Sequence, residues 1–327
     1  MPSLSSADHS VTPPKVDIPR DYNAAHDLIE RNLRAGRADK VAFIDDAGQY
    51  TFGELAERAN RFASGLKAMG IGMEDRVLLA LSDTIDFPTA FLGAIKAGIV
   101  PVSVNTWLTP NDYEYMLGDS RARALIVSEH LLPQFSPLIG KMPCLRHVLV
   151  SGRRAAGHAA LEDVLAAGSP AFDPAPTTSD DACCWFYSSG STGRPKGVVH
   201  VHSSVIITAE LYGKAVLGVN EHDVLFSSAK LSFVYGLGNA LTFPLAAGAT
   251  AVLMPERATP AAVFNRLVER KTTIFYGVPT LYASMLASPE FPSRTDLALR
   301  ACVSAGEALP ADLGKRWKEK VGVDILE

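Results

Sequence analysis

A loop rich in glycine and hydroxyl side chains lies near the middle of the 327-residue sequence, and its residue types suit phosphate binding. It reads YSSGSTGRPKG over residues 187–197, between the apolar, strand-like runs 182–186 and 198–199. The backbone N–H groups and hydroxyls of such a loop can surround phosphate oxygens, while Lys196 adds a positive charge. A flexible surface turn is the alternative, because Gly, Ser and Pro also dominate turns. The Walker A pattern is excluded, since Lys196 follows proline and precedes glycine.

The composition of the whole chain limits the partners of this loop. A formal net charge of −4 gives no broad cationic surface, so we expect no nucleic-acid partner, although a local basic site for a nucleotide or coenzyme A is compatible with it. The longest apolar stretch, residues 240–255, is broken by Pro244 and Gly248, so we expect no membrane partner. None of the cysteines has C-x-x-C spacing, and we expect no metal site among the side chains and a cytoplasmic protein with reduced thiols. They are Cys144, Cys183, Cys184 and Cys302.

Strand-like and helical patterns alternate along nearly the whole chain. Helix N-termini are indicated by Thr51 with Glu54, which form a capping box, and by the Thr-Pro pairs at 109–110 and 259–260. The near-continuous apolar strands predict an α/β fold with mostly parallel sheets, covered by helices on both faces. The expected strands include residues 76–81, 100–104, 124–127, 272–276 and 299–304, and the expected helices include 87–97 and 279–287.

The chain length and one proline-rich segment predict two subdomains. Residues 167–181 carry prolines and terminal polar residues without periodicity, and they are the predicted linker between a first α/β subdomain, 21–166, and a second, 182–327. Residues 1–20 lack the apolar core of a signal peptide and are interpreted as a flexible N-terminal arm. The chain ends inside a strand-like run at 321–327, which favours a fragment whose second subdomain is incomplete.

Four motifs together resemble the adenylate-forming superfamily, which includes acyl-CoA and aryl-CoA synthetases, luciferase and adenylation domains. The phosphate loop matches that family's [YF]-[ST]-S-G-[ST]-T-G-x-P-K-G pattern in full. Three other segments follow in the order that the family requires: GAIKAGIVPV at 93–102, YGVPT at 276–280 and SAGEALP at 304–310. The resemblance implies the N-terminal domain of the adenylate-forming fold, with two βα subdomains packed as αβαβα, truncated before its third sheet and C-terminal domain.

The resemblance also implies which residues bind ATP. The β- and γ-phosphates would be held by the loop, and catalytic roles fall to Lys196 and Thr192, with Mg²⁺ accompanying the ATP. The adenine would lie against Ala305, Gly306, Glu307 and Ala308, where a glycine lets a flat ring approach the backbone. The phosphate-binding residues are Ser188, Ser189, Gly190, Ser191, Thr192, Gly193 and Lys196.

Residues 230–239, KLSFVYGLGN, are predicted to determine substrate choice, and their sequence most resembles that of benzoate–CoA ligases. Phe233 takes the place of that branch's gate residue, and Val234 and Tyr235 would touch an aryl ring. Ser232 and Val234 depart from the branch, where phenylalanine and alanine are more usual, so a substituted benzoate stays open beside benzoate. An ordinary helix start in the core is the alternative interpretation.

Two histidines after the loop, His200 and His202, are two residues apart on a predicted strand and would share one face. Adenylation needs no histidine base, because the attacking carboxylate is already ionised, so both are interpreted as structural.

The predicted function is an ATP-dependent aromatic acid–CoA ligase that activates a benzoate-like acid as acyl-AMP, releases pyrophosphate and then forms the CoA thioester. By resemblance, several groups needed later lie beyond Glu327, so we expect little thioester synthesis from residues 1–327 alone. A ligase for a non-aromatic acid and a nucleotide-binding fragment without turnover stay open as alternatives. A homodimer also stays open.

Overall fold

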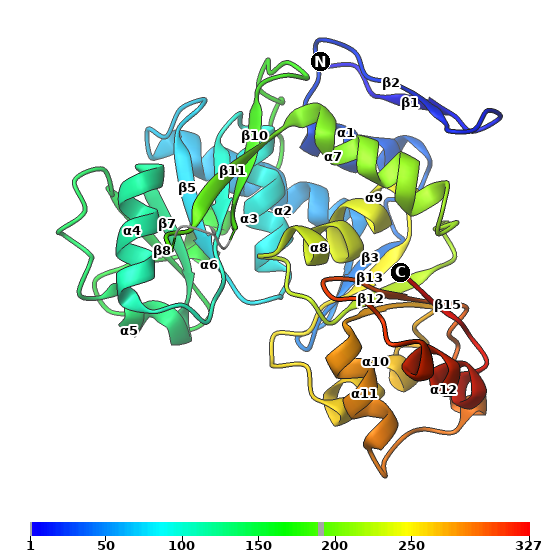
Figure 1. Cartoon of the computed structure of the whole chain (residues 1–327). Helices are drawn as coiled ribbons and strands as arrows, with labels where there is room; N and C mark the ends of the chain where they lie inside the picture. Colours follow the sequence, from blue (N-terminus) through cyan, green and yellow to red (C-terminus); the bar gives the residue numbers. More distant parts are fainter. Residues whose placement is uncertain (1, 189–192) are drawn as a thin grey trace.

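Two seven-stranded sheets frame the described part of the chain, residues 2–188 and 193–327 of a computed structural model (Figure 1). Within these two sheets, all neighbouring strands are parallel except the pairs β10–β11 and β3–β4. The first sheet has the order β11 (Lys196–Val201), β10 (Ala182–Ser188), β6 (Val100–Ser103), β5 (Arg76–Ala80), β7 (Ala124–Ser128), β8 (His147–Ser151) and β9 (Ala159–Ala160). The second has the order β16 (Ile325–Leu326), β15 (Ala301–Ser304), β14 (Ile274–Gly277), β12 (Val224–Ser227), β13 (Thr250–Val252), β3 (Val41–Ile44) and β4 (Gln49–Thr51).

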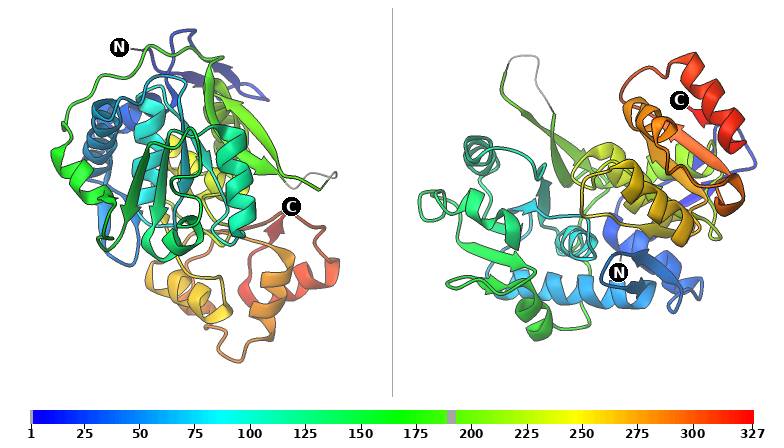
Figure 2. Two further views of the ribbon diagram at one scale, coloured as in Figure 1. Left: turned by 90° about the vertical axis from the view of Figure 1, so that its left-hand side faces the viewer. Right: turned by 90° about the horizontal axis from the view of Figure 1, so that it is seen from below.

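Helices cover both faces of each sheet, which gives the predicted αβαβα layers (Figures 1 and 2). The layer between the sheets contains α1 (Ala24–Arg34), α2 (Phe52–Ala68), α3 (Asp86–Lys96), α7 (His202–Thr208), α8 (Val234–Leu237) and α9 (Phe243–Ala247), with the π-helices η2 (Ala209–Lys214) and η3 (Gly238–Thr242). The outer layers contain α4 (Pro110–Ser120) and α5 (Leu132–Phe135) on one side, and α10 (Pro260–Glu269), α11 (Pro279–Ala287) and α12 (Ala311–Val321) on the other. The short α6 (Leu161–Ala167) packs against α2.

Alternate residues of the buried strands face different helix layers. On β5, Val77 and Leu79 belong to the apolar cluster between the sheets, whereas Leu78 and Ala80 belong to the cluster beneath α4 and α5. Successive side chains of a strand point to opposite faces, and here both faces are covered. This is why the sequence of these strands is continuously apolar.

The predicted helix starts are confirmed. Thr51 and Glu54 form a reciprocal capping box at the start of α2, and Thr109 does the same with Asp112 at the start of α4. The Thr259 side chain accepts the Ala262 N–H at the start of α10. Across the described ranges, the helices fall short of the length and apolar character that a bilayer crossing requires.

The division of strands between the sheets does not follow the predicted subdomains, 21–166 and 182–327. From the first segment, β3 and β4 join the second sheet, and from the second segment β10 and β11 join the first. Parallel strands are joined by long crossover connections, so neighbours in sequence need not be neighbours in a sheet. The pattern of alternating elements therefore predicts the fold class but not the sheet to which each strand belongs.

The predicted linker, 167–181, is packed along the protein surface. Its backbone bonds to the opening segment of the first subdomain, with the Tyr22 N–H donating to the Thr177 carbonyl at 3.1 Å. The buried Asn23 side chain also donates to the Thr177 hydroxyl at 3.1 Å. The segment thus contributes to the packing of α1.

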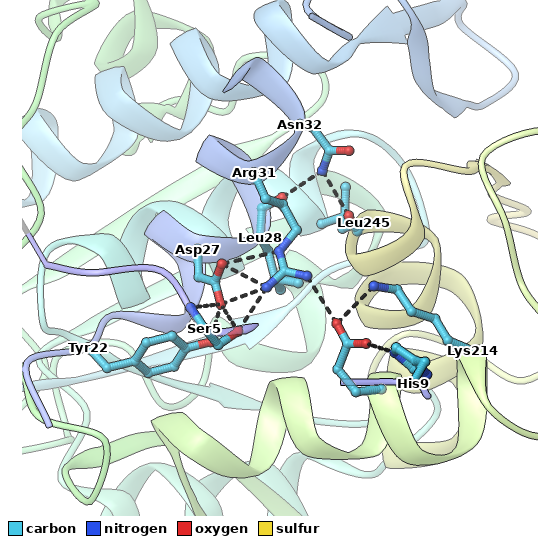
Figure 3. Close-up of polar contacts among 10 residues, drawn as sticks. Ser5, His9, Tyr22, Asp27, Leu28, Arg31, Asn32, Lys214 and Leu245 are labelled. Carbon is cyan, nitrogen blue, oxygen red and sulfur yellow. Dashed lines mark hydrogen bonds and ion pairs between the residues drawn. The ribbon is translucent and has the colours of Figure 1, made fainter. Parts of the chain in front are cut away.

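The N-terminal arm forms a hairpin of β1 (Ser6–Asp8) and β2 (Lys15–Asp17) in its described residues. Side chains attach it at two points: the Ser5 hydroxyl donates to Asp27, and the His9 ring lies 2.8 Å from the Glu210 carboxylate (Figure 3). The interpretation of residues 1–20 as a loose arm therefore misses a docked hairpin.

Candidate active site

The phosphate loop connects two antiparallel strands at an edge of the first sheet. Ser188 ends β10 and Lys196 begins β11, and the two are register partners. Gly193 has φ +96°, a left-handed conformation that favours glycine. Four predicted phosphate-binding residues, Ser189, Gly190, Ser191 and Thr192, lie outside the described residues.

Aromatic residues and α4 support the base of this hairpin. The Tyr187 hydroxyl donates to the Asp119 carboxylate at 2.8 Å, and burial together with Asp119 raises the pKa of Tyr187. The Arg194 guanidinium lies 5.4 Å from the centre of the Tyr115 ring. Arg194 and Gly193 line an open hollow of 390 Å³ beside α4. Asp112 and Glu114 of α4 line the same hollow, so the cationic Arg194 of the loop lies close to acidic residues of α4, while Lys196 begins β11.

The predicted adenine segment follows β15 at the carboxyl edge of the second sheet. Because β15 pairs with β14, Ser304 lies opposite Gly277, and residues 305–308 lie next to the turn that begins α11. Gly306 has φ +93°, and a Cβ built there meets no heavy atom within 4 Å, so the backbone is open to a flat ligand. The buried Ser304 hydroxyl has no partner among the described residues. This edge fits a nucleotide base, since crevices outside the carboxyl ends of parallel strands are where such ligands bind.

The three predicted pocket residues do not share one cavity. Phe233 precedes α8, is 42% exposed and lines a groove of 460 Å³ with Trp107 and Arg257. Val234 borders a cavity of 100 Å³, and Tyr235 points the other way, its hydroxyl donating to the Gly277 carbonyl at 3.2 Å. Successive residues of a helix are about 100° apart around its axis, which separates these neighbours.

The 100 Å³ cavity joins α8 to the strands of the phosphate loop. Besides Val234 it is lined by Cys184 and Phe186 of β10 and by His200 of β11. The His200 ring contacts Phe186 edge to face at 5.9 Å, and burial lowers the pKa of His200. Helix α8 therefore touches both sheets, with its Val234 side on the loop hairpin and its Tyr235 side on β14.

The two histidines do not share a strand face. His200 lies on β11, but His202 is the first residue of α7. His202 is buried, its Nδ1 accepts the Ala24 N–H at 3.0 Å, and burial lowers its pKa to about 4. A neutral ring that accepts this bond in the core supports the structural interpretation of His202.

The sequence motif at 276–280 includes Tyr276 but does not indicate that its side chain is buried near Tyr235 of α8. Tyr276 of β14 is fully buried, and its hydroxyl has no partner among the described residues. Burial raises the pKa of Tyr276, and the nearby hydroxyls of Tyr212 and Tyr235 act in the same direction. The available signal was the position of Tyr276, which alternates with Phe275 and so faces the layer between the sheets.

Across residues 2–188 and 193–327, no three His, Cys, Asp or Glu side chains gather so as to hold a metal ion. A magnesium ion that accompanies ATP takes most of its ligands from phosphates and water.

Replacing Tyr235 by phenylalanine should destabilise the protein modestly. The change removes the donor to the Gly277 carbonyl, and we expect a loss of about 1 kcal/mol in the free energy of unfolding by urea. Tyr115→Phe is the control, because in the described residues the Tyr115 hydroxyl donates no hydrogen bond. Equal unfolding midpoints for the two variants would contradict the expectation.

Two mostly parallel sheets, a Gly-rich loop between β10 and the edge strand β11, and an open glycine at a carboxyl edge are the features of an α/β protein of the adenylate-forming class. Residues 29–327 match the family model described as AMP-binding enzyme, and the chain belongs to this family.

Two curated relatives are named as ligases of aromatic acids. The chain is 61% identical over 328 aligned residues to a benzoate–CoA ligase of Thauera aromatica, covering all of this chain and 62% of that protein. It is 47% identical to a 4-hydroxybenzoate–CoA/benzoate–CoA ligase of Rhodopseudomonas palustris, covering 94% of this chain and 57% of that one. The chain thus spans about three fifths of the length of these relatives.

A solved structure shows the same arrangement of elements. A benzoate CoA ligase from Burkholderia xenovorans superimposes with a TM-score of 0.87 at 49% identity, over 93% of this chain and 60% of that one. An anthranilate CoA ligase in complex with anthranoyl-AMP gives a TM-score of 0.91 at 40% identity, over 94% and 60%. The predicted fold is therefore confirmed, and the chain covers 60% of each of these two solved structures.

Proposed function

We propose that the full-length protein is an ATP-dependent aromatic acid–CoA ligase acting on benzoate or a substituted benzoate. The observation that carries the proposal is the 61% identity to a benzoate–CoA ligase along the entire chain. The geometry supports it, because α8 packs between the loop hairpin and the edge that bears residues 305–308. An acid held at α8 would lie between the groups proposed for the phosphates and for the adenine.

In the proposed first step, the carboxylate of the acid attacks the α-phosphorus of ATP. A bond forms between the carboxyl oxygen and phosphorus, the bond to the bridging oxygen breaks, and pyrophosphate leaves with that oxygen. The protein supplies position and charge rather than a nucleophile. Lys196 and the hydroxyl of Thr192 would bind the phosphates as charge shifts onto them, and Mg²⁺ would neutralise part of that charge.

The remaining loop residues would donate backbone and hydroxyl hydrogen bonds to the β- and γ-phosphates. Ala305, Gly306, Glu307 and Ala308 would border the adenine, and Phe233, Val234 and Tyr235 would surround the acid. The phosphate-binding set is Ser188, Ser189, Gly190, Ser191, Thr192, Gly193 and Lys196.

Pyrophosphate release by the full-length protein across a panel of acids tests the proposal. We expect release with benzoate or its hydroxy and amino derivatives, and much less with cyclohexane carboxylate or a short fatty acid. Release of pyrophosphate with only the non-aromatic acids would favour the alternative of a ligase for a non-aromatic acid. If calorimetry shows ATP binding but no acyl-AMP is formed, the alternative of a nucleotide-binding protein without turnover is favoured.

The second step would transfer the acyl group from AMP to the thiol of coenzyme A. We expect residues 1–327 alone to form little CoA ester, and appreciable ester from this chain would contradict that expectation. A homodimer and a cytoplasmic location belong to the same proposal, and size-exclusion chromatography of the full-length protein tests the first of these.

A further inference from the structure

A buried carboxylate, Asp83, connects the two sheets beside the predicted acid pocket. Asp83 follows β5 of the first sheet and is 4% exposed. Both of its carboxylate oxygens accept the N–H of Leu231, each at 3.2 Å, and Leu231 follows β12 of the second sheet. The segment that leads from β12 to Phe233 is thus held from the opposite sheet.

The neighbouring Lys230 is buried as well and completes this attachment. Its ammonium group donates to the carbonyls of Met254 and Glu256, the latter at 2.6 Å. Burial raises the pKa of Asp83 to about 7, while the charge of Lys230 opposes that rise. The other charged side chains near Lys230 are those of Glu256 and Arg266.

Helix α8 rests directly on the backbone that this pair holds. The Phe233 N–H donates to the Lys230 carbonyl at 2.9 Å, and the Leu237 N–H donates to the Phe233 carbonyl at 2.8 Å. A Cβ at Gly236 would lie 2.1 Å from the Lys230 carbonyl oxygen and 2.5 Å from that of Ala229. With no space between the helix and residues 229–230, a shift of this backbone displaces α8.

We propose that Asp83 is a positioning residue for the acid site: by holding Leu231 across the two sheets, it sets the place of Phe233 and α8. The inference rests on the proposed function only for the identity of the bound acid. Asp83 acts through the backbone and does not touch the reacting atoms.

Kinetics of Asp83→Asn in the full-length protein test this role. Asparagine has the same shape and can still accept the Leu231 N–H, but it removes the charge that strengthens the bond. We expect the KM for benzoate to rise up to about tenfold, the difference between a charge-assisted and a neutral hydrogen bond, with the KM for ATP unchanged.

Asp45→Asn is the matched control. Asp45 is also 4% exposed and accepts the N–H of Ile85 at 2.9 Å, but it has no hydrogen bond to residues 229–237. It should lower stability without a selective change in the KM for benzoate. The same selective change in Asp45→Asn would overturn the proposal, because loss of any buried carboxylate would then suffice.

The pH profile separates positioning from general stability. Below about pH 7 the Asp83 carboxyl gains a proton in the folded protein and becomes a weaker acceptor. The KM for benzoate should therefore rise as the pH falls through this range in the wild type, and this inflection should be absent in Asp83→Asn. An identical inflection in the variant would assign it to another group.

Hydrogen exchange decides the role without turnover. The amides of Leu231, Phe233 and Leu237 should exchange faster in Asp83→Asn than in the wild type, with no such change in Asp45→Asn. Unchanged exchange would overturn the proposal. If the wild type releases no pyrophosphate with any aromatic acid, the proposed function fails, and the exchange result still decides whether Asp83 positions α8.

Discussion

Gly236→Ala should abolish most acid activation and destabilise the protein. The added Cβ would lie 2.1 Å from the Lys230 carbonyl oxygen and 2.5 Å from that of Ala229, both far inside van der Waals contact, and both oxygens belong to the backbone. The clash is relieved only if α8 moves away from residues 229–230. Overpacking of this kind lowers the free energy of unfolding by about 3 kcal/mol. Because Phe233, Val234 and Tyr235 would move with the helix, we expect kcat/KM for benzoate to fall roughly 100-fold, as for a misplacement of about 1 Å.

Gly118→Ala provides the contrast. Gly118 lies in the exposed part of α4, has no positive φ, and a Cβ there meets no atom within 4 Å. Alanine should raise the free energy of unfolding by about 0.5–1 kcal/mol and leave pyrophosphate release unchanged. Wild-type activity in Gly236→Ala would show that α8 tolerates displacement, and it would remove the basis of both this prediction and the Asp83 inference.

Arg31→Met should cause a large loss of stability. The Arg31 guanidinium of α1 bonds to Asp27 at 2.8 Å and to Glu210 at 3.1 Å, and these carboxylates are 0% and 3% exposed (Figure 3). Removing it leaves two buried carboxylates with fewer partners. Breaking a buried pair in this way costs about 3–5 kcal/mol, measurable by urea unfolding.

The loss of stability in Arg31→Met should become smaller at low pH. Burial by itself would raise the pKa of Glu210, but Lys214, His9 and Arg31 hold it below its ordinary value of 4.5. A carboxylate whose pKa is lower in the folded than in the unfolded protein stabilises the fold at any pH above its unfolded-state pKa. This stabilisation is lost as the pH falls through the folded-state pKa. The difference between wild type and Arg31→Met should therefore narrow below pH 4.5.

Arg20→Ala is the matched control for a surface pair. Arg20 contacts Asp180, but the two side chains are 73% and 66% exposed. We expect a change of about 0–1 kcal/mol in the free energy of unfolding, since solvent screens such pairs. A loss in Arg31→Met no larger than that in Arg20→Ala would contradict the importance of the buried network.

Local features of the fold were predictable because they depend on residues close in sequence. Thr51 and Thr109 start helices through side chains three residues away, and that geometry is set within one turn. The alternation of apolar strands and amphipathic helices likewise predicts the α/β class. The loop motif that indicates the family lies within eleven consecutive residues, 187–197, so it is visible in the sequence alone.

The orientation of side chains around α8 was not predictable in the same way. Val234 and Tyr235 are adjacent in sequence, yet one borders β10 and the other bonds to Gly277 of β14. Which side of a short helix meets which strand depends on the packing of distant segments. Asp83 is the extreme case: it lies 148 positions from Leu231, and no local pattern joins them.

The sequence by itself determined the family and the αβαβα class, because composition, periodicity and a contiguous motif are properties of nearby residues. Only the tertiary structure decided that β3 and β10 exchange sheets relative to the order of the chain, and that the arm docks through Ser5 and His9. It also decided that α8 lies wedged between the two sheets on the backbone of residues 229–230. The physical reason is that sheet pairing and burial join segments far apart in the chain, whose contacts leave no local trace in their sequences.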